Sequence, residues 1–217
     1  MNIFAVVLSG CGVYDGTEIH EAVLTMLAIV KNGGSYQIFA PDIEQYHVIN
    51  HFNGKETNEK RNVLIESARI ARGKIQALST FDATQFDALI FPGGFGCAKN
   101  LSTFAFQGAD CTVNEDVVKA VKAMHTANKP IGALCIAPVV ITKILGKVDV
   151  TIGVDEQTAL KIEKMGGNHH ITQQAEVIKD TNFKVFTTPC YMLDSNIAQI
   201  AEGAENIVKA MICEIGK

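Results

Sequence analysis

The chain has 217 residues, of which 47% are hydrophobic and 19% are charged, and its formal net charge is −4. This composition is typical of a folded protein with a sizeable core, and it excludes a disordered chain and a basic nucleic-acid-binding surface. We therefore expect a single domain over residues 1–217 that binds neither nucleic acid nor membranes.

The first residues and the cysteine pattern favour an intracellular protein. Residues 1–9 form a short apolar run without a basic start or a cleavage site, so they predict a strand rather than a targeting segment. The six cysteines stand singly, and the six histidines do not combine with them at zinc spacing. We expect a cytoplasmic location, free thiols and no metal.

Apolar runs and helical patterns alternate along the first half of the chain. A strand is expected at 3–9, followed by a glycine-rich turn at 10–16, a helix at 18–31 and a second strand at 35–40. The polar stretch 41–61 contains Asn53-Gly54 and predicts a small hairpin inserted at the sheet edge. A helix at 61–72 and a buried strand at 88–91 complete this half.

The second half continues the alternation. The expected helices are 114–127, 136–145, 155–165 and 195–214, and the expected strands are 131–134 and 148–152. Residues 175–178 and 184–186 predict a hairpin joined through 180–182.

Continuous apolar strands separated by helices indicate a mostly parallel sheet covered on both faces. The predicted fold is a three-layer α/β/α sandwich of flavodoxin-like type. Ligands of such sheets lie beyond the carboxyl ends of the strands. The segments 11–21 and 92–94 and the residue Cys135 follow such ends, so we expect them to converge.

Cys135 lies where an apolar strand turns directly into a helix, in the segment Lys129-Pro-Ile-Gly-Ala-Leu-Cys-Ile-Ala-Pro138. A side chain at such an elbow is held out of the sheet, beside the positive end of the next helix. These surroundings favour a nucleophilic thiolate. The alternative is one of the inert buried cysteines of protein cores.

Two further features admit two interpretations each. Glu18 and Glu21 are one helical turn apart and either act on the thiol site or complement the helix dipole. We favour the dipole role for Glu18, and a role at the thiol for Glu21, whose helix face is predicted to be partly buried. Pro92-Gly-Gly94 supplies either a turn with positive φ or bare N–H groups for an oxyanion.

The chain resembles the ThiJ/PfpI superfamily within the class I glutamine amidotransferase-like fold, and most closely the ElbB-type isoprenoid biosynthesis glyoxalases. The resemblance rests on motifs that include Phe91-Pro-Gly-Gly-Phe-Gly96 and Cys135-Ile-Ala-Pro138. The other matching segments are 8–22, 47–51, 61–73, 98–101 and 188–193. Together they cover nearly the whole chain.

The resemblance implies a nucleophile at Cys135, a hydrogen-bonded glutamate at Glu21 and an oxyanion-holding amide at Gly94. It also implies a glyoxalase that needs no cofactor and a homodimer. The chain departs from the pattern at Ile136, where protease-like members carry a histidine, and near Gly153, where some glyoxalase members do. His169 is a candidate substitute from another loop, or a surface histidine.

These observations predict an enzyme that converts methylglyoxal or glyoxal to the 2-hydroxy acid through Cys135 and Glu21, with Gly94, Ile136, Glu18 and His169 around the substrate. The alternative is a non-catalytic redox-sensing or chaperone-like member of the same fold. An amidotransferase-like hydrolase is a third possibility, which Ile136 weakens.

Overall fold

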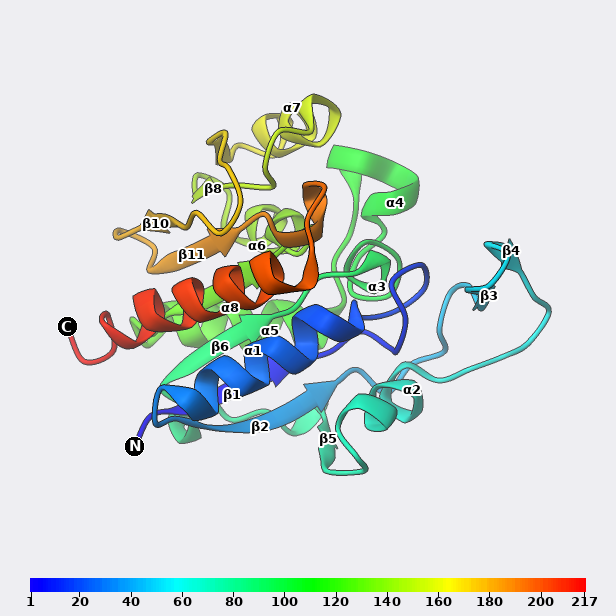
Figure 1. Cartoon of the computed structure of the whole chain (residues 1–217), viewed down its shortest axis with the longest axis horizontal. Coiled ribbons are helices and arrows are strands. Elements are labelled where there is room, and N and C mark those ends of the chain that lie inside the picture. Colours follow the sequence, from blue (N-terminus) through cyan, green and yellow to red (C-terminus); the bar gives the residue numbers. More distant parts are fainter.

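A seven-stranded sheet forms the centre of the computed structural model, which describes residues 1–217 (Figure 1). Its order is β10-β11-β7-β6-β1-β2-β5, and every neighbouring pair is parallel except β10 with β11. The strands are β1 (Ile3–Val7), β2 (Ser35–Ala40), β5 (Ile75–Ala77), β6 (Ala88–Phe91), β7 (Ile131–Leu134), β10 (Ile178–Asp180) and β11 (Val185–Thr188). The predicted mostly parallel, flavodoxin-like sheet is confirmed.

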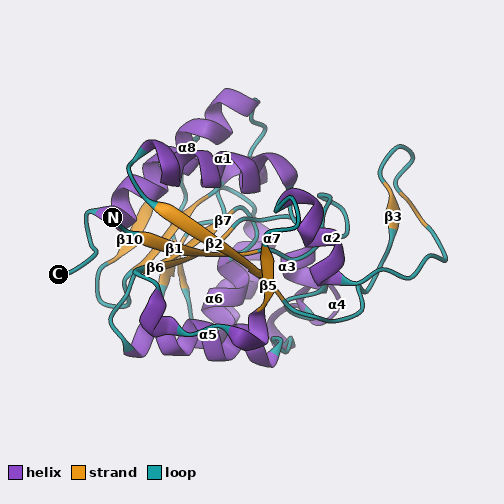
Figure 2. Ribbon diagram, turned by 90° about the horizontal axis from the view of Figure 1, so that it is seen from below, coloured by secondary structure: helices purple, strands orange, loops and turns teal.

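Helices cover both faces of this sheet, as the sequence predicts (Figure 2). On one face lie α1 (Ile19–Lys31) and α8 (Ile197–Ile212), which pack against each other, and on the other lie α5 (Glu115–Thr126) and α6 (Pro138–Leu145). The helix α2 (Val63–Ile70) packs near β2 and β5, and α7 (Glu156–Lys164) packs against α6. The three layers of the predicted sandwich are therefore present.

The period of two along β1 divides the core into two halves. Phe4, Val6 and Leu8 belong to the cluster that includes α1 and α8, whereas Ala5 and Val7 belong to the cluster that includes α5 and α6. All five are at most 1% exposed. Successive side chains of a strand point to opposite faces, so an unbroken apolar run needs cover on both sides.

Several elements differ from the sequence-based prediction. The hairpin of β3 (Ile49–Asn50) and β4 (Lys55–Glu56) forms, but as a separate two-stranded sheet that projects from the body rather than at the sheet edge (Figure 1). The strand expected at 148–152 is only β8 (Asp149–Val150), which pairs with β9 (Asn168–His169) outside the main sheet. The strand β5 and the short helices α3 (Phe95–Lys99) and α4 (Phe104–Gln107) are additional. One-turn 3₁₀ helices lie at Leu78–Thr80, Ala83–Gln85, Gly108–Asp110 and Cys190–Met192.

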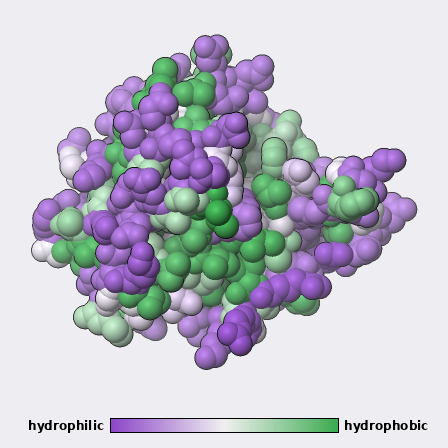
Figure 3. All heavy atoms as spheres, in the orientation of Figure 1, coloured by the Kyte–Doolittle hydropathy of each residue, from purple (hydrophilic) through white to green (hydrophobic).

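An apolar stripe lies on the solvent side of α1. Ile19, Val23, Leu27 and Val30 recur at helical spacing and are between 42% and 56% exposed. Figure 3 shows apolar side chains gathered over this part of the face seen in Figure 1. No helix combines the length and apolar character needed to cross a membrane.

Candidate active site

Cys135 stands at the elbow between β7 and α6. Its φ is +57°, a left-handed conformation that is uncommon for a residue with a side chain and that clusters at functional sites. The turn is held by hydrogen bonds from the Cys135 N–H to the Thr188 carbonyl, at 3.0 Å, and from the Ala137 N–H to the Leu134 carbonyl, at 2.9 Å. The predicted strand-to-helix elbow is confirmed.

Glu21 reaches the same place from the first turn of α1. Its side chain is completely buried. Its Oε2 accepts a 2.8 Å hydrogen bond from the Gly93 N–H, its Oε1 accepts a 3.3 Å bond from the Tyr191 N–H, and the carboxyl group lies beside the thiol of Cys135, which acts to lower the pKa of Glu21. A buried carboxyl group held by two backbone N–H groups is positioned for chemistry at the thiol.

Glu18 has a different position. It is the N-cap residue of α1, and its Oε2 accepts a 2.6 Å hydrogen bond from the N–H of Glu21. The helix-start role favoured for Glu18 is thus present, although the residue is only 8% exposed. Its charge also acts on the site, because it contributes to raising the pKa of Glu21.

The Pro92-Gly-Gly94 turn after β6 combines both interpretations made from the sequence. Gly94 has a φ of +98°, and its N–H faces the sulfur of Cys135 and, like the N–H of Ile136, acts to lower the pKa of that thiol. A Cβ on Gly94 would lie 2.3 Å from the Glu18 nitrogen. Only glycine therefore fits at this position, and its amide is available to a group on the sulfur.

Gly93 is a site residue that the sequence analysis missed. A Cβ there would lie 2.4 Å from the Cβ of Cys135 and 2.6 Å from Oε2 of Glu21. The absence of a side chain lets the thiol and the carboxyl group approach each other. The signal was the doubled glycine, since Gly94 alone accounts for the positive φ.

The electrostatics contradict the expected thiolate. Burial, followed by repulsion from Glu21, raises the pKa of the Cys135 thiol well above its ordinary value, and the N–H groups of Gly94 and Ile136 oppose this only partly. Burial, followed by repulsion from Glu18, raises the pKa of Glu21 to about 8. Desolvation outweighs the helix N-terminus because Cys135 is only 7% exposed. At neutral pH the pair therefore holds protons on both groups.

A second buried thiol adjoins the site and was not singled out from the sequence. Cys190 follows β11, is 2% exposed, and its pKa is raised by burial and then by Glu21 and Glu18. The hydroxyl of the next residue, Tyr191, forms a 2.9 Å hydrogen bond with Nδ1 of His20. Nothing in the local pattern identified Cys190, because its proximity depends on β11 lying beside β7.

Two further predicted site residues, Ile136 and His169, have different surroundings. Ile136 is half-buried and contributes its backbone N–H to the thiol site. His169 lies in β9, where its Nε2 accepts a 3.4 Å hydrogen bond from the Ile152 N–H, and it lines a cavity beside α7. Its pKa is lowered by burial, and neither Cys135 nor Glu21 contributes to that shift. The hydrogen bond of His169 and the cavity that it lines involve neither Cys135 nor Glu21.

The site is small and has no metal-ligand geometry. No group of three or more His, Cys, Asp or Glu side chains is arranged to hold a metal ion. Because so little of Cys135 is exposed, a compound that reaches the sulfur must be compact. The arrangement offers a nucleophilic atom, a carboxyl group that can exchange a proton, and backbone donors for a developing negative charge.

The chain is similar to known proteins over nearly its whole length. Residues 13–189 match the family model described as the DJ-1/PfpI family. The human "Glutamine amidotransferase-like class 1 domain-containing protein 3, mitochondrial" is 48% identical, over 98% of this chain and 83% of that protein. The rat "ES1 protein homolog, mitochondrial" is 47% identical, over 98% and 84%.

Solved structures share the fold. An Ehrlichia chaffeensis "isoprenoid biosynthesis protein with amidotransferase-like domain" superposes with a TM-score of 0.92 at 35% identity, covering 99% of both chains. Drosophila melanogaster DJ-1beta superposes with a TM-score of 0.57 at 14% identity, covering all of this chain and 91% of that one, which shows the fold alone.

These relatives correct the expected location. The human, rat and zebrafish proteins are all named mitochondrial, which contradicts the cytoplasmic location expected from the sequence. The expectation rested on unpaired cysteines and the lack of a secretory pattern. Both features separate reducing from oxidising surroundings, but they do not distinguish one reducing compartment from another.

Proposed function

The chain belongs to the DJ-1/PfpI family, and on that basis we propose that it is a cofactor-independent glyoxalase acting on small 2-oxoaldehydes such as methylglyoxal or glyoxal. The observation that carries the proposal is the close placement of the Glu21 carboxyl group and the Cys135 thiol at the elbow, on either side of Gly93. A carboxyl group beside a nucleophilic sulfur can move a proton between the two adjacent carbons that such substrates contain.

In the proposed reaction the sulfur of Cys135 adds to the aldehyde carbon, and the thiol proton passes to the former aldehyde oxygen. The product is a hemithioacetal, and the N–H groups of Gly94 and Ile136 are available to the negative charge that develops during addition. No oxidant or cofactor is consumed, since the sulfur and the aldehyde supply every atom of this intermediate.

Glu21 then completes an internal oxidation and reduction of the substrate. Its carboxylate removes the hydrogen from the former aldehyde carbon, and the hydroxyl proton on that carbon's oxygen passes to the ketone oxygen, which gives an enediol. Glu21 then returns its proton to the neighbouring carbon, so that the former ketone becomes an alcohol and the carbon bound to Cys135 becomes a thioester. Water releases the 2-hydroxy acid and restores the thiol. A carboxyl group with a pKa of about 8 suits both steps, because it gives and takes a proton near neutral pH.

The second candidate is a redox sensor of the same fold. Two molecules of hydrogen peroxide oxidise the Cys135 thiol to the sulfinic acid and are reduced to water. The raised pKa of Glu21 favours this candidate, since a protonated carboxyl group can donate a hydrogen bond to an oxidised sulfur. The burial of Cys135 counts against it, because oxidation of cysteine follows thiolate character and exposure.

The two candidates differ in the stoichiometry of their products. Purified protein is incubated with methylglyoxal in the absence of glutathione, and lactate is measured over time. Many molecules of lactate for each chain support the glyoxalase. A thiol that captures the aldehyde once and stops supports the sensor.

We also propose that the protein is a homodimer formed through α1. The stripe of Ile19, Val23, Leu27 and Val30 is apolar, helical and unpartnered within the chain. A second copy of the chain would bury this stripe, because a twofold axis beside α1 places the stripe of one copy against the same stripe of the other.

A further inference from the structure

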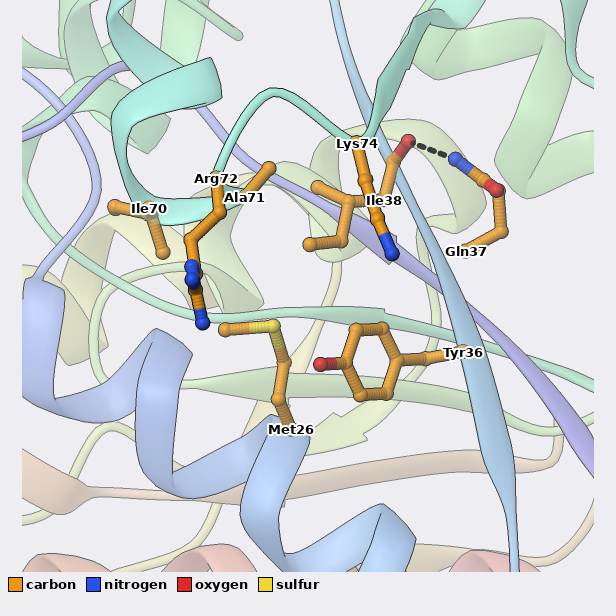
Figure 4. A pocket seen from close by; sticks show the side chains of 8 residues that line it. All are labelled: Met26, Tyr36, Gln37, Ile38, Ile70, Ala71, Arg72 and Lys74. Carbon is orange, nitrogen blue, oxygen red and sulfur yellow. Dashed lines mark hydrogen bonds between the residues drawn. The ribbon is translucent and has the colours of Figure 1, made fainter.

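A cavity of about 430 Å³ lies at the edge of the sheet, away from the residues of the thiol site (Figure 4). It is an open cavity bordered by α1, β2, the end of α2 and the segment that follows, where Arg72 and Lys74 are exposed. Its volume falls within the roughly 300–1,000 Å³ typical of small-molecule sites. The lining residues are Met26, Tyr36, Gln37, Ile38, Ile70, Ala71, Arg72 and Lys74.

The two cations of the cavity have no partner in the protein. Neither Arg72 nor Lys74 is among the ion pairs, and neither side chain donates a hydrogen bond to another group of the chain. No acidic residue lines the cavity. Figure 4 shows both charged ends directed into the space beside Met26 and Tyr36. In a chain with a net charge of −4, this is a local concentration of positive charge.

The backbone at Arg72 supports a role for its side chain. Arg72 has a φ of +52° directly after the end of α2, at the position where helices usually place glycine. A glycine does follow, one residue later, at Gly73. A side chain kept in a conformation that disfavours it indicates a use for that side chain.

Part of the cavity lining is apolar. Met26 is 8% exposed, Ile38 3% and Ala71 7%, so these side chains form a floor that belongs to the protein core. The ring of Tyr36 borders this floor, and its hydroxyl points toward the same space (Figure 4). A ligand that fills the cavity therefore meets both positive charge and apolar surface.

We propose that this cavity binds an organic anion in which a carboxylate or phosphate head is joined to a short apolar body. The guanidinium of Arg72 binds two oxygens of the head, and Lys74 contributes a second positive charge. The apolar body lies on Met26 and Ile38. This assignment does not depend on the reaction proposed for Cys135.

Isothermal titration calorimetry with four probes separates the contribution of the anionic head to binding from that of the apolar body. Hexyl phosphate and hexanoate carry both parts, inorganic phosphate carries only a head, and hexanol carries only a body. We expect binding of hexyl phosphate, hexanoate or both, and at least tenfold weaker binding of inorganic phosphate and hexanol. The stronger of the two amphiphilic probes identifies the head. Equal binding of inorganic phosphate and hexyl phosphate, or no binding of either amphiphile, overturns the proposal.

Variants place the binding in this cavity. The double variant Arg72→Gln with Lys74→Gln is expected to weaken the better probe by about 10–100-fold, the range expected from losing charged hydrogen bonds. Lys147→Gln removes the same kind of charge from an exposed site outside the cavity and is expected to bind as the unmodified protein does. Arg72→Gly, which suits the backbone, is expected to lose affinity without losing thermal stability. Unchanged affinity in the double variant, or an equal loss in Lys147→Gln, contradicts the assignment.

Discussion

The carboxyl group of Glu21 lies beside the thiol of Cys135 in a space that the missing side chain of Gly93 leaves open. The two residues are 114 positions apart in the sequence and meet because β1, β6 and β7 are neighbours in a parallel sheet. Both groups are buried, and burial raises the pKa of each. At neutral pH the thiol and the carboxyl group are therefore both protonated, and Cys135 is not a preformed thiolate.

Replacing Glu21 and Glu18 separately tests which carboxyl group moves protons. Glu21→Gln is expected to reduce turnover of methylglyoxal by about 10²–10⁴-fold, because an amide cannot accept the substrate proton. Glu18→Gln is expected to have a much smaller effect, since its remaining side-chain oxygen can still cap the N–H of Glu21. Single-turnover kinetics measures both, with circular dichroism to verify folding. An inactive Glu18→Gln beside an active Glu21→Gln would reverse the assignment.

The raised pKa of Glu21 also predicts how stability depends on pH. Its pKa rises from 4.5 in the unfolded chain to about 8 in the folded one, so the folded state retains a proton that the unfolded state releases. The free energy of unfolding therefore falls between about pH 4.5 and pH 8. The effect is on the order of 5 kcal/mol at most, since each pKa unit is worth roughly 1.4 kcal/mol.

Urea unfolding at several pH values compares the protein with Glu21→Gln, which has no proton to lose. As pH rises from 5 to 8, the unfolding free energy of the unmodified protein is expected to fall relative to that of Glu21→Gln. Contributions of other groups cancel in this difference. A difference that does not change with pH would mean that Glu21 titrates normally.

The fold could be predicted from the sequence because its signals are local. Unbroken apolar runs identified β6 and β7, and the apolar run directly followed by a helix identified the elbow at Cys135. The three residues of β5 are too few, and too exposed, to stand out from a loop. The helices α3 and α4 are five and four residues long, too short to show helical spacing.

The site was only partly predictable for a different reason. Cys135, Glu21 and Gly94 were found because each follows a strand end with unusual chemistry. The contribution of Cys190 depends on which strand pairs with β7, and that pairing leaves no mark on the sequence near Cys190. The position of Cys135 at a helix N-terminus predicted a lowered pKa. In the structure burial of the thiol raises its pKa, and burial depends on the whole fold.

Gly93→Ala tests the close approach at the centre of the site. An added Cβ would meet both Cys135 and Glu21 at less than 3 Å, so the variant is expected to lose about 1–3 kcal/mol of stability and most of its activity. Gly203→Ala, in α8, is the matched control, because a Cβ there would meet Oγ1 of Thr188 at 3.4 Å and Sγ of Cys190 at 3.6 Å, which are ordinary contact distances. Thermal unfolding and lactate formation are measured for both. Equal behaviour of the two variants would show that the gap at Gly93 is not required.

The α1 stripe predicts the state of association. Light scattering at micromolar concentration is expected to give twice the 23.4 kDa mass of one chain. Val23→Asp with Leu27→Asp is expected to give monomers, because charges would be buried in the interface. Leu160→Asp, on the exposed side of α7, is the control and should leave the dimer intact. A monomeric mass for the unmodified protein refutes this assignment.

The most direct test of the account is the number of lactate molecules that each chain forms from methylglyoxal without glutathione, compared between Cys135→Ser and Cys213→Ser. Both variants lose one thiol, but Cys213 is exposed and far from the elbow in sequence. We expect many turnovers for the unmodified protein and for Cys213→Ser, and none for Cys135→Ser. Sustained lactate formation by Cys135→Ser would contradict the central role of this thiol.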